Sequence, residues 1–116
     1  MPATIPLPAL KQLKIGALQR EVSKFILARY DQAEQNSLNA LMIEALRRVP
    51  AWSNRQALIA QVHDWISTAL DEYFAKKAVV NAATTTAQVA VVSLDLTAVD
   101  IADPKVSLQT VRSTRS

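Results

Sequence analysis

Apolar residues recur with the spacing of amphipathic helices, most clearly over residues 53–77. At about 100° per residue, the apolar side chains of this segment gather on roughly half of the helix surface. They are Leu58, Ile59, Val62, Trp65, Ile66, Ala69, Leu70, Tyr73 and Phe74. Ser53 and Gln56 have the spacing of a capping box, and Lys76 and Lys77 suit the negative end of a helix dipole. The pattern predicts a core helix over residues 53–77.

A second helix is predicted over residues 9–30. Its stripe contains Leu18, Val22, Phe25, Ile26 and Arg29, with Tyr30 at the edge. Leu10 and Leu13 fall off this stripe, which predicts a kink or a phase shift near Gly16.

The third helix is predicted between these two. Its stripe contains Leu38, Leu41, Met42, Ala45, Leu46 and Val49. This stripe is displaced by about half a turn from the preceding one, so the chain must break between them. Asp31 and Glu34 form a capping-box-like pair that would start the new helix, and Pro50 would stop it after Val49.

Both ends of the chain have a different character. Pro2, Pro6 and Pro8 predict an extended arm over residues 1–8. After Lys77 the chain is rich in threonine and β-branched residues, and Thr85 or Thr86 could cap one short helical turn. Strand-like alternation of apolar and polar residues follows at Val92, Leu94 and Leu96 and again, beyond a turn at Asp103 and Pro104, at Val106 and Leu108.

The predicted fold is therefore mainly α. A three-helix bundle (residues 9–80) lies between an extended Pro-rich N-terminal arm (1–8) and an extended, partly β C-terminal arm (81–116). The predicted strands either fold back over the bundle or pair with another chain, and an unpaired strand edge favours the second arrangement. On that interpretation, truncation after Val80 leaves a folded helical body that has lost its attachment arm.

The formal net charge of +3 is unevenly distributed. Residues 1–56 carry eight basic and four acidic side chains, residues 57–104 two basic and six acidic, and residues 105–116 three basic and none acidic. Segments of opposite sign favour self-association or a partner of matching polarity. An unevenly charged solvated surface is the alternative, because salt screens such charges beyond about 8 Å.

Composition excludes several kinds of chemistry. Without cysteine there is no disulfide, thiolate nucleophile or cysteine-ligated metal, and a single glycine excludes glycine-rich phosphate loops. No apolar run approaches the roughly 18 residues of a membrane span, and the first residues lack the pattern of a signal peptide. We therefore expect a soluble protein that is not exported by that route.

No pattern in the sequence indicates catalysis. His63, the only histidine, is beside Asp64, but adjacent helical residues do not face each other. Asp71 and Glu72 are also sequence neighbours, and the spacing of the arm aspartates Asp95, Asp100 and Asp103 matches no calcium loop. We predict a protein that is not an enzyme, with no catalytic residues, no metal and no cofactor.

Basic residues could form a nucleic-acid-binding face. They are Lys11, Lys14, Arg20, Lys24, Arg29, Arg47, Arg48 and Arg55. Helix-turn-helix recognition needs an exposed first turn on its second helix, and the segment after Asn54 soon becomes apolar, so nucleic acid is the less favoured partner. Trp52, next to the Pro50 turn, is the tryptophan expected to contact a partner protein.

Three segments resemble a known group of proteins. They are ARYD (28–31), NRQALIAQVHDWISTALDEYFAKK (54–77), and LDL with DPKVSL (94–108). They are similar to small proteins encoded among the tail-fibre and baseplate genes of tailed bacteriophages. That group has an Asn-Arg pair before the central helix, a Trp-Ile pair within it, an aromatic pair near its end, a threonine-rich linker and an Asp-Pro tail.

The resemblance implies a structural protein of the phage tail, baseplate or fibre attachment that acts through protein–protein contacts. Its partners would be other phage structural proteins in a homo- or hetero-oligomer, and it would be soluble in the host cytoplasm before it joins the virion. The candidate partner-binding residues are Trp52, Val92, Leu94, Leu96, Val106 and Leu108. A tail-fibre assembly chaperone and a small helical nucleic-acid-binding protein are the alternatives.

Overall fold

The structure is a computed structural model that describes residues 5–114. Its long helices are α1 (Leu7–Arg29), α2 (Gln32–Arg47) and α3 (Ser53–Ala82). Short helices follow at α4 (Thr86–Ala90), α5 (Thr97–Ile101) and α6 (Leu108–Ser113). The prediction of a mainly α protein is confirmed.

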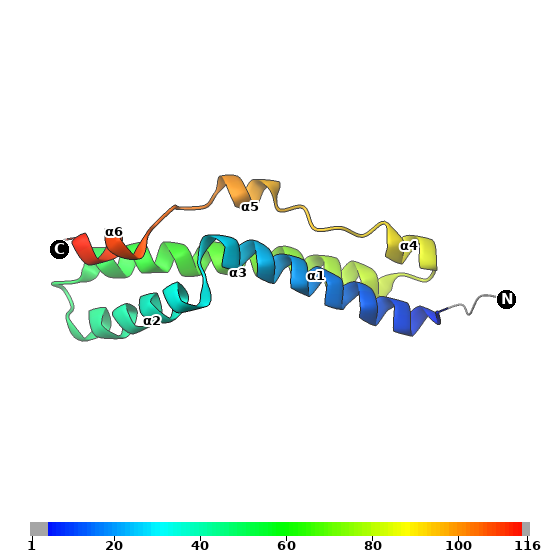
Figure 1. The fold of residues 1–116 in the computed structure, drawn as a ribbon, viewed down its shortest axis with the longest axis horizontal. Helices are drawn as coiled ribbons and strands as arrows, with labels where there is room; N and C mark the ends of the chain where they lie inside the picture. The colour runs from blue at the N-terminus through cyan, green and yellow to red at the C-terminus, as the bar shows by residue number, and fades with distance from the viewer. Residues whose placement is uncertain (1–4, 115–116) are drawn as a thin grey trace.

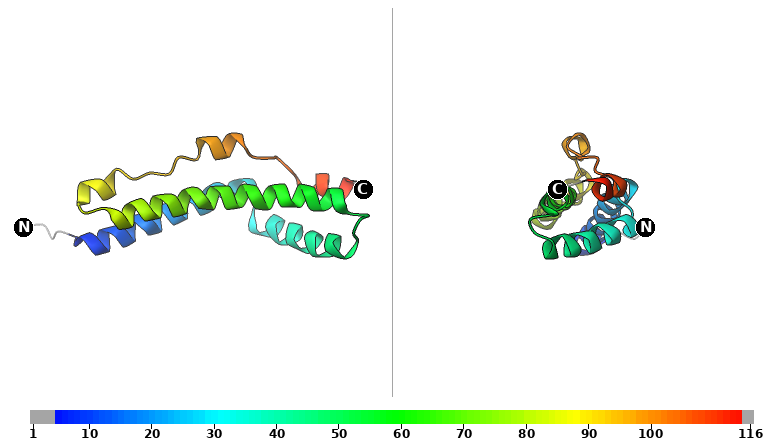
Figure 2. Two further views of the ribbon diagram at one scale, coloured as in Figure 1. Left: turned by 180° about the vertical axis from the view of Figure 1, so that it is seen from behind. Right: turned by 90° about the vertical axis from the view of Figure 1, so that its left-hand side faces the viewer.

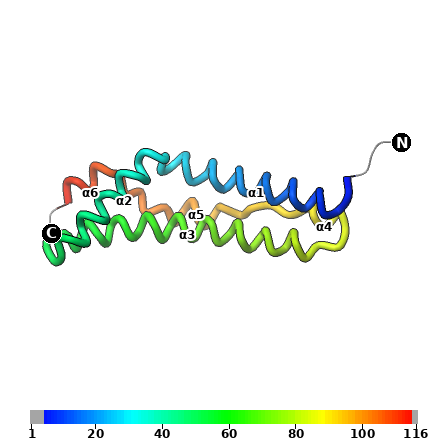
Figure 3. The backbone as a smooth tube through the Cα atoms, turned by 90° about the horizontal axis from the view of Figure 1, so that it is seen from below, coloured from blue at the N-terminus to red at the C-terminus, as the bar shows by residue number. Residues whose placement is uncertain are grey.

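The helices form a rod of 66 × 23 × 20 Å, and α3 runs along most of it (Figure 1). α1 and α2 follow one another along α3, in the opposite direction to it (Figure 3). Residues 83–114, which we call the arm, then return along the rod (Figure 2). Within the arm, α4 contacts α1, α5 contacts α3, and α6 contacts both α2 and α3.

This layering differs from the predicted three-helix bundle. α1 and α2 each pack on α3, and the arm supplies the third layer. The cause lies at the link between α1 and α2, where Tyr30 is extended and the Asp31 carboxylate accepts a hydrogen bond from the Glu34 N–H at 2.7 Å. The predicted cap at Asp31 is confirmed, and the link is short enough for α2 to continue along α3.

The core runs the length of the rod and includes the arm. Its buried hydrophobic residues in α1 to α3 are Leu18, Val22, Ile26, Tyr30, Leu38, Ala45, Ile59, Val62, Trp65, Ala69, Tyr73 and Val80. From the arm come Ala83, Val89, Val92, Val99, Val106 and Val111. The arm is therefore part of the hydrophobic core.

The predicted β character of the arm is wrong, because no strand occurs in residues 5–114. Thr85 and Ser107 instead cap short helices by accepting hydrogen bonds from the Gln88 and Thr110 N–H groups. The alternation of apolar and polar residues still matches the pattern of buried and exposed side chains in the extended segment after α4, where Val92 is buried and Ser93 is exposed. An extended chain lying on helices buries alternate side chains without a neighbouring strand.

Several predicted helix ends also differ. α1 begins at Leu7, since proline is tolerated in a first helical turn, so the N-terminal arm does not reach residue 8. Residues 1–4 of that predicted arm lie outside the described residues. α3 continues past Lys77 to Ala82, where the fully buried Val80 gives its last turns a packing role. Ser53 does not cap α3; its hydroxyl donates to the Pro50 carbonyl at 2.8 Å.

Some residues of the predicted stripes lie on the surface. Leu46, Val49 and Phe74 are exposed, although their spacing predicted burial. α1 continues through Gly16, and Leu13 is simply exposed. In a rod about two helices wide, each helix has few neighbours, so the buried sector is narrower than the apolar stripe.

Candidate functional site

The acid and base candidates do not converge. His63 Nε2 lies 2.9 Å from Asn39 Oδ1, and Asp71 is exposed. Glu72 accepts hydrogen bonds from the Lys76 ammonium and from the Asp95 N–H, at 2.8 and 2.9 Å. Within residues 5–114, no group of three or more histidine or acidic side chains could hold a metal ion.

Trp65 of α3 packs against both the α1 side of the core and the arm, at the middle of the rod. Its ring centroid lies 5.5 Å from that of Phe25 and 5.5 Å from that of Tyr30, both on the α1 side. Its indole N–H donates to the carbonyl of Val99 in α5 at 2.7 Å. One side chain therefore contacts the α1 side of the core and the arm simultaneously.

A polar network beside Trp65 holds the next stretch of the arm. The Tyr30 hydroxyl donates to Asp103 Oδ1 at 2.9 Å and accepts from the Val106 N–H at 3.3 Å. Arg29 forms an ion pair with Asp100. These contacts join the end of α1 to the chain on either side of Pro104.

Raising the pH should loosen this network through Tyr30. Burial, the hydrogen bond to Asp103 and the charge of that carboxylate together raise the pKa of Tyr30 from 10.0 to about 12, while the hydrogen bond from Val106 acts in the opposite direction. The folded state thus favours the neutral phenol. The resulting stabilisation is complete below the unfolded pKa of 10.0 and is lost as the pH rises towards about 12.

Melting temperatures of the wild type and Tyr30→Phe, measured between about pH 8 and about pH 11.5, test this expectation. The wild type should lose stability more steeply than the variant above about pH 10. Parallel declines would contradict it.

Many basic side chains of the proposed nucleic-acid face bind the chain itself. Lys11 Nζ donates to the Asn81 carbonyl at 2.9 Å, and Lys14 Nζ to the Ala90 carbonyl at 3.4 Å. Arg55 donates to the carbonyls of Arg112 and Thr114, both at 2.9 Å. Together with the Arg29 ion pair, these contacts tie α1 and α3 to later parts of the chain.

Most predicted partner-binding residues belong to the core. Val92 and Val106 are buried, whereas Leu94, Leu96 and Leu108 are partly buried and packed against the core. Of the two arrangements predicted for the arm, the structure has the one in which the arm folds back on its own chain. Trp52 is half-buried at one end of the rod and is the one candidate outside the arm.

Trp52 lies at the centre of a basic tip, which we define as residues 43–55 together with Arg112. The guanidinium carbons of Arg48 and Arg55 lie 4.8 and 4.1 Å from the centre of the Trp52 ring. Arg48 also donates to Glu44 at 2.9 Å. These cation–π contacts hold two arginines at one end of the molecule. The sequence indicated arginines flanking the Pro50 turn, but not the contribution of Arg112.

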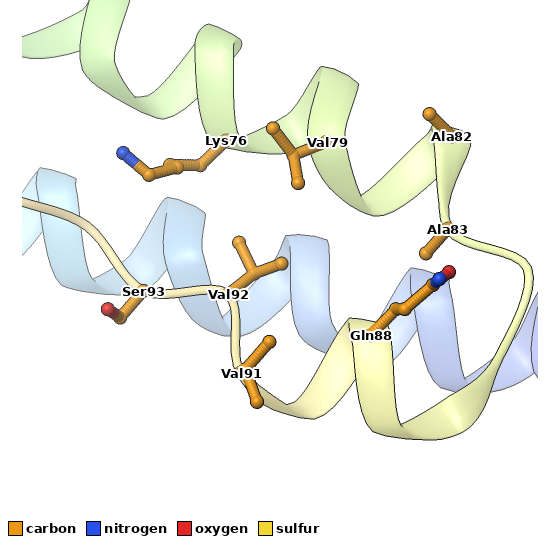
Figure 4. Close-up of a pocket in the computed structure, with 8 residues that line it drawn as sticks. All are labelled: Lys76, Val79, Ala82, Ala83, Gln88, Val91, Val92 and Ser93. Carbon is orange, nitrogen blue, oxygen red and sulfur yellow. The ribbon is translucent and has the colours of Figure 1, made fainter.

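An apolar groove lies at the other end of the rod. It has a volume of about 600 Å³ between the end of α3 and the chain around α4. Val79 projects from α3 opposite Val91 and Val92, with Ala83 at the turn and Lys76 at one edge (Figure 4). No sequence motif predicted this groove, since its walls come from segments joined only by the turn after α3.

None of the helices in residues 5–114 has the length and apolar character needed to cross a membrane. Comparisons of the chain with protein-family models, with curated proteins and with solved structures found no match. The function of the chain is therefore inferred from its motifs and its geometry.

Proposed function

We propose that this chain is a non-enzymatic structural protein of a tailed bacteriophage, a tail, baseplate or fibre-attachment component that acts through protein–protein contacts. The sequence motifs supply the link to phage proteins. The observation that carries the structural role is the 66 Å rod, whose arm is secured along its length by buried valines and by hydrogen bonds. Such a body suits a spacer or connector that holds two partners a set distance apart.

This proposal keeps the predicted contact at Trp52 but replaces the predicted attachment arm with other surfaces. The arm side chains are used within the molecule, so partners would bind the exposed parts. These are the basic tip at one end and the groove near α4 at the other. A connector with a distinct surface at each end can join two different proteins or successive copies of itself.

A tail-fibre assembly chaperone is the second candidate, and the groove favours it. Its volume of about 600 Å³ lies within the range of about 300–1,000 Å³ that is typical of ligand pockets. An apolar segment of an unassembled client could be sheltered there. Nucleic-acid binding is third, because Lys11, Lys14 and Arg55 are engaged within the chain.

A mass-spectrometric inventory of purified phage particles distinguishes these roles. We expect the chain at a fixed copy number in mature particles, because a connector remains in the structure it helps to build. Its absence from mature particles, together with its presence on unassembled fibres, would favour the chaperone. Affinity for duplex DNA that falls steeply with added salt would favour the nucleic-acid-binding protein.

A further inference from the structure

The outer side of α2 presents an uncovered apolar stripe. Ile43 and Leu46 lie three residues apart in α2 and so are neighbours on its surface, and Val49 follows in the turn just after the helix. Their exposed fractions are 58%, 62% and 60%. α3 packs against α2 on another side, with Leu38 and Ala45 buried. Large apolar side chains grouped on a surface mark a site of association.

The charge around this stripe restricts what can cover it. Arg47, Arg48, Arg55 and Arg112 with the single acid Glu44 give the tip a formal charge of +3, which equals the net charge of the whole chain. The remaining basic and acidic residues therefore balance. Two tips would repel each other, so the stripe does not suit a symmetric tip-to-tip pair. Its complement is a surface that is both acidic and apolar.

The chain carries such a surface at α5, which we call the α5 crest (Asp64 with residues 100–102). Ile101 is 81% exposed, and the neighbouring Asp100 side chain remains half exposed beside Arg29. Asp64 of α3 and Ala102 line a shallow pocket of about 370 Å³ next to it. α5 stands out from the rod near its midpoint, within reach of another molecule (Figure 1, Figure 2).

The arm segment that carries the crest is acidic as well, although Arg29 of α1 pairs with Asp100 and offsets part of its charge. From Thr85 to Pro104 the chain contains Asp95, Asp100 and Asp103 and no lysine or arginine. The crest therefore combines the two properties that the tip requires of a partner, an exposed aliphatic side chain and nearby carboxylates.

We propose that the basic tip of one copy docks on the α5 crest of a second copy. The α2 stripe covers Ile101, and the tip arginines face Asp64 and Asp100. Planar guanidinium groups match carboxylates well, and the stacking on Trp52 restrains Arg48 beforehand. Arg55 stacks on the same ring but already donates to the carbonyls of Arg112 and Thr114, so it contributes its charge. The contact joins two different surfaces. The copy that uses its tip still has a free crest, and the copy that uses its crest still has a free tip. Further copies can therefore add at both ends, and the assembly extends as a staggered chain.

The proposal goes beyond a role in phage particles, because it concerns the purified chain alone. Monomeric behaviour in solution would leave the virion proposal untouched, and absence from particles would leave this one untouched. The contact involves only one end of a rod and one short helix, and interfaces smaller than roughly 1,200 Å² are typically weak, so we expect weak association.

Sedimentation velocity from about 10 μM to about 1 mM, the range of weak complexes, tests the first consequence. We expect the average mass to rise with concentration at low salt and to fall when salt is added, because charges contribute to the contact. Leu46→Asp and Ile101→Gln should each weaken association about tenfold or more. Leu13→Asp, at a leucine of α1 that is 59% exposed and lies in neither surface, is the matched control and should behave as the wild type does.

Mixing the two variants tests the pairing itself. A Leu46→Asp copy keeps its crest and an Ile101→Gln copy keeps its tip, so the mixture should form a dimer and nothing larger. Circular dichroism confirms that each variant is folded. A wild type that stays monomeric at every concentration would overturn the proposal, as would a mixture that forms no dimer. Association of the tip only with anionic vesicles or duplex DNA would also overturn it.

Discussion

Truncation after Ala82 is expected to abolish the cooperative unfolding of the remaining helices. The deletion removes Val89, Val92, Val99, Val106 and Val111, all buried in the common core. Each buried valine contributes about 1.5–3 kcal/mol before the cost of ordering the chain. A domain of this size has a total stability of about 5–15 kcal/mol, and we expect a net loss of more than about 5 kcal/mol.

This expectation reverses the one drawn from the sequence, in which a chain truncated near Val80 stays folded. Thermal unfolding followed by circular dichroism, with a dye that binds exposed apolar surface, provides the measurement. A synthetic peptide of residues 83–114 is the control, since adding it back should restore the transition if the lost contacts are the cause. A sharp transition at the wild-type temperature in the truncated chain would show that the helices alone suffice.

Trp65→Ala is expected to cost about 3–5 kcal/mol of unfolding free energy, as is typical when a large aromatic side chain is removed from a core. The change leaves a cavity between Phe25 and Tyr30, whose rings both contact the indole. It also leaves the Val99 carbonyl without the donor that lies 2.7 Å away. Urea denaturation measures the loss.

Two further variants separate the contributions at Trp65. Trp65→Phe retains an aromatic ring but removes the N–H donor, so it should cost less than Trp65→Ala. Leu46→Ala, at a residue that is mostly exposed, should change stability by no more than about 0.5 kcal/mol. Equal midpoints for Trp65→Ala and Leu46→Ala would mean that Trp65 does not hold the layers together.

The predictions for Trp65 and for the arm both depend on the contact between Trp65 and α5. Trp65 contacts α5 only if the arm lies on the rod, so the effects of Trp65→Ala and of truncation should not add. Stability measured for Trp65→Ala within the truncated chain tests this point. A fully additive loss would indicate that Trp65 stabilises only the contact between α1 and α3.

Local chemistry along the sequence determined the long helices and several of their ends. The displaced stripes predicted the break between α1 and α2, and Asp31 caps α2 as its spacing with Glu34 indicates. Thr85 likewise caps the short helix α4. Caps and helix breaks depend on residues a few positions apart, so they can be predicted from the sequence without knowing the fold.

Only the tertiary structure decided what the arm does. The alternation around Val92 identified its buried side chains, but it could not distinguish a strand in a sheet from an extended chain lying on helices. That choice depends on partners far away in sequence: Val99 meets Trp65, and Asp103 meets Tyr30. The same long-range packing left Leu46 and Phe74 exposed, because whether an apolar side chain is buried depends on which elements come to lie against it.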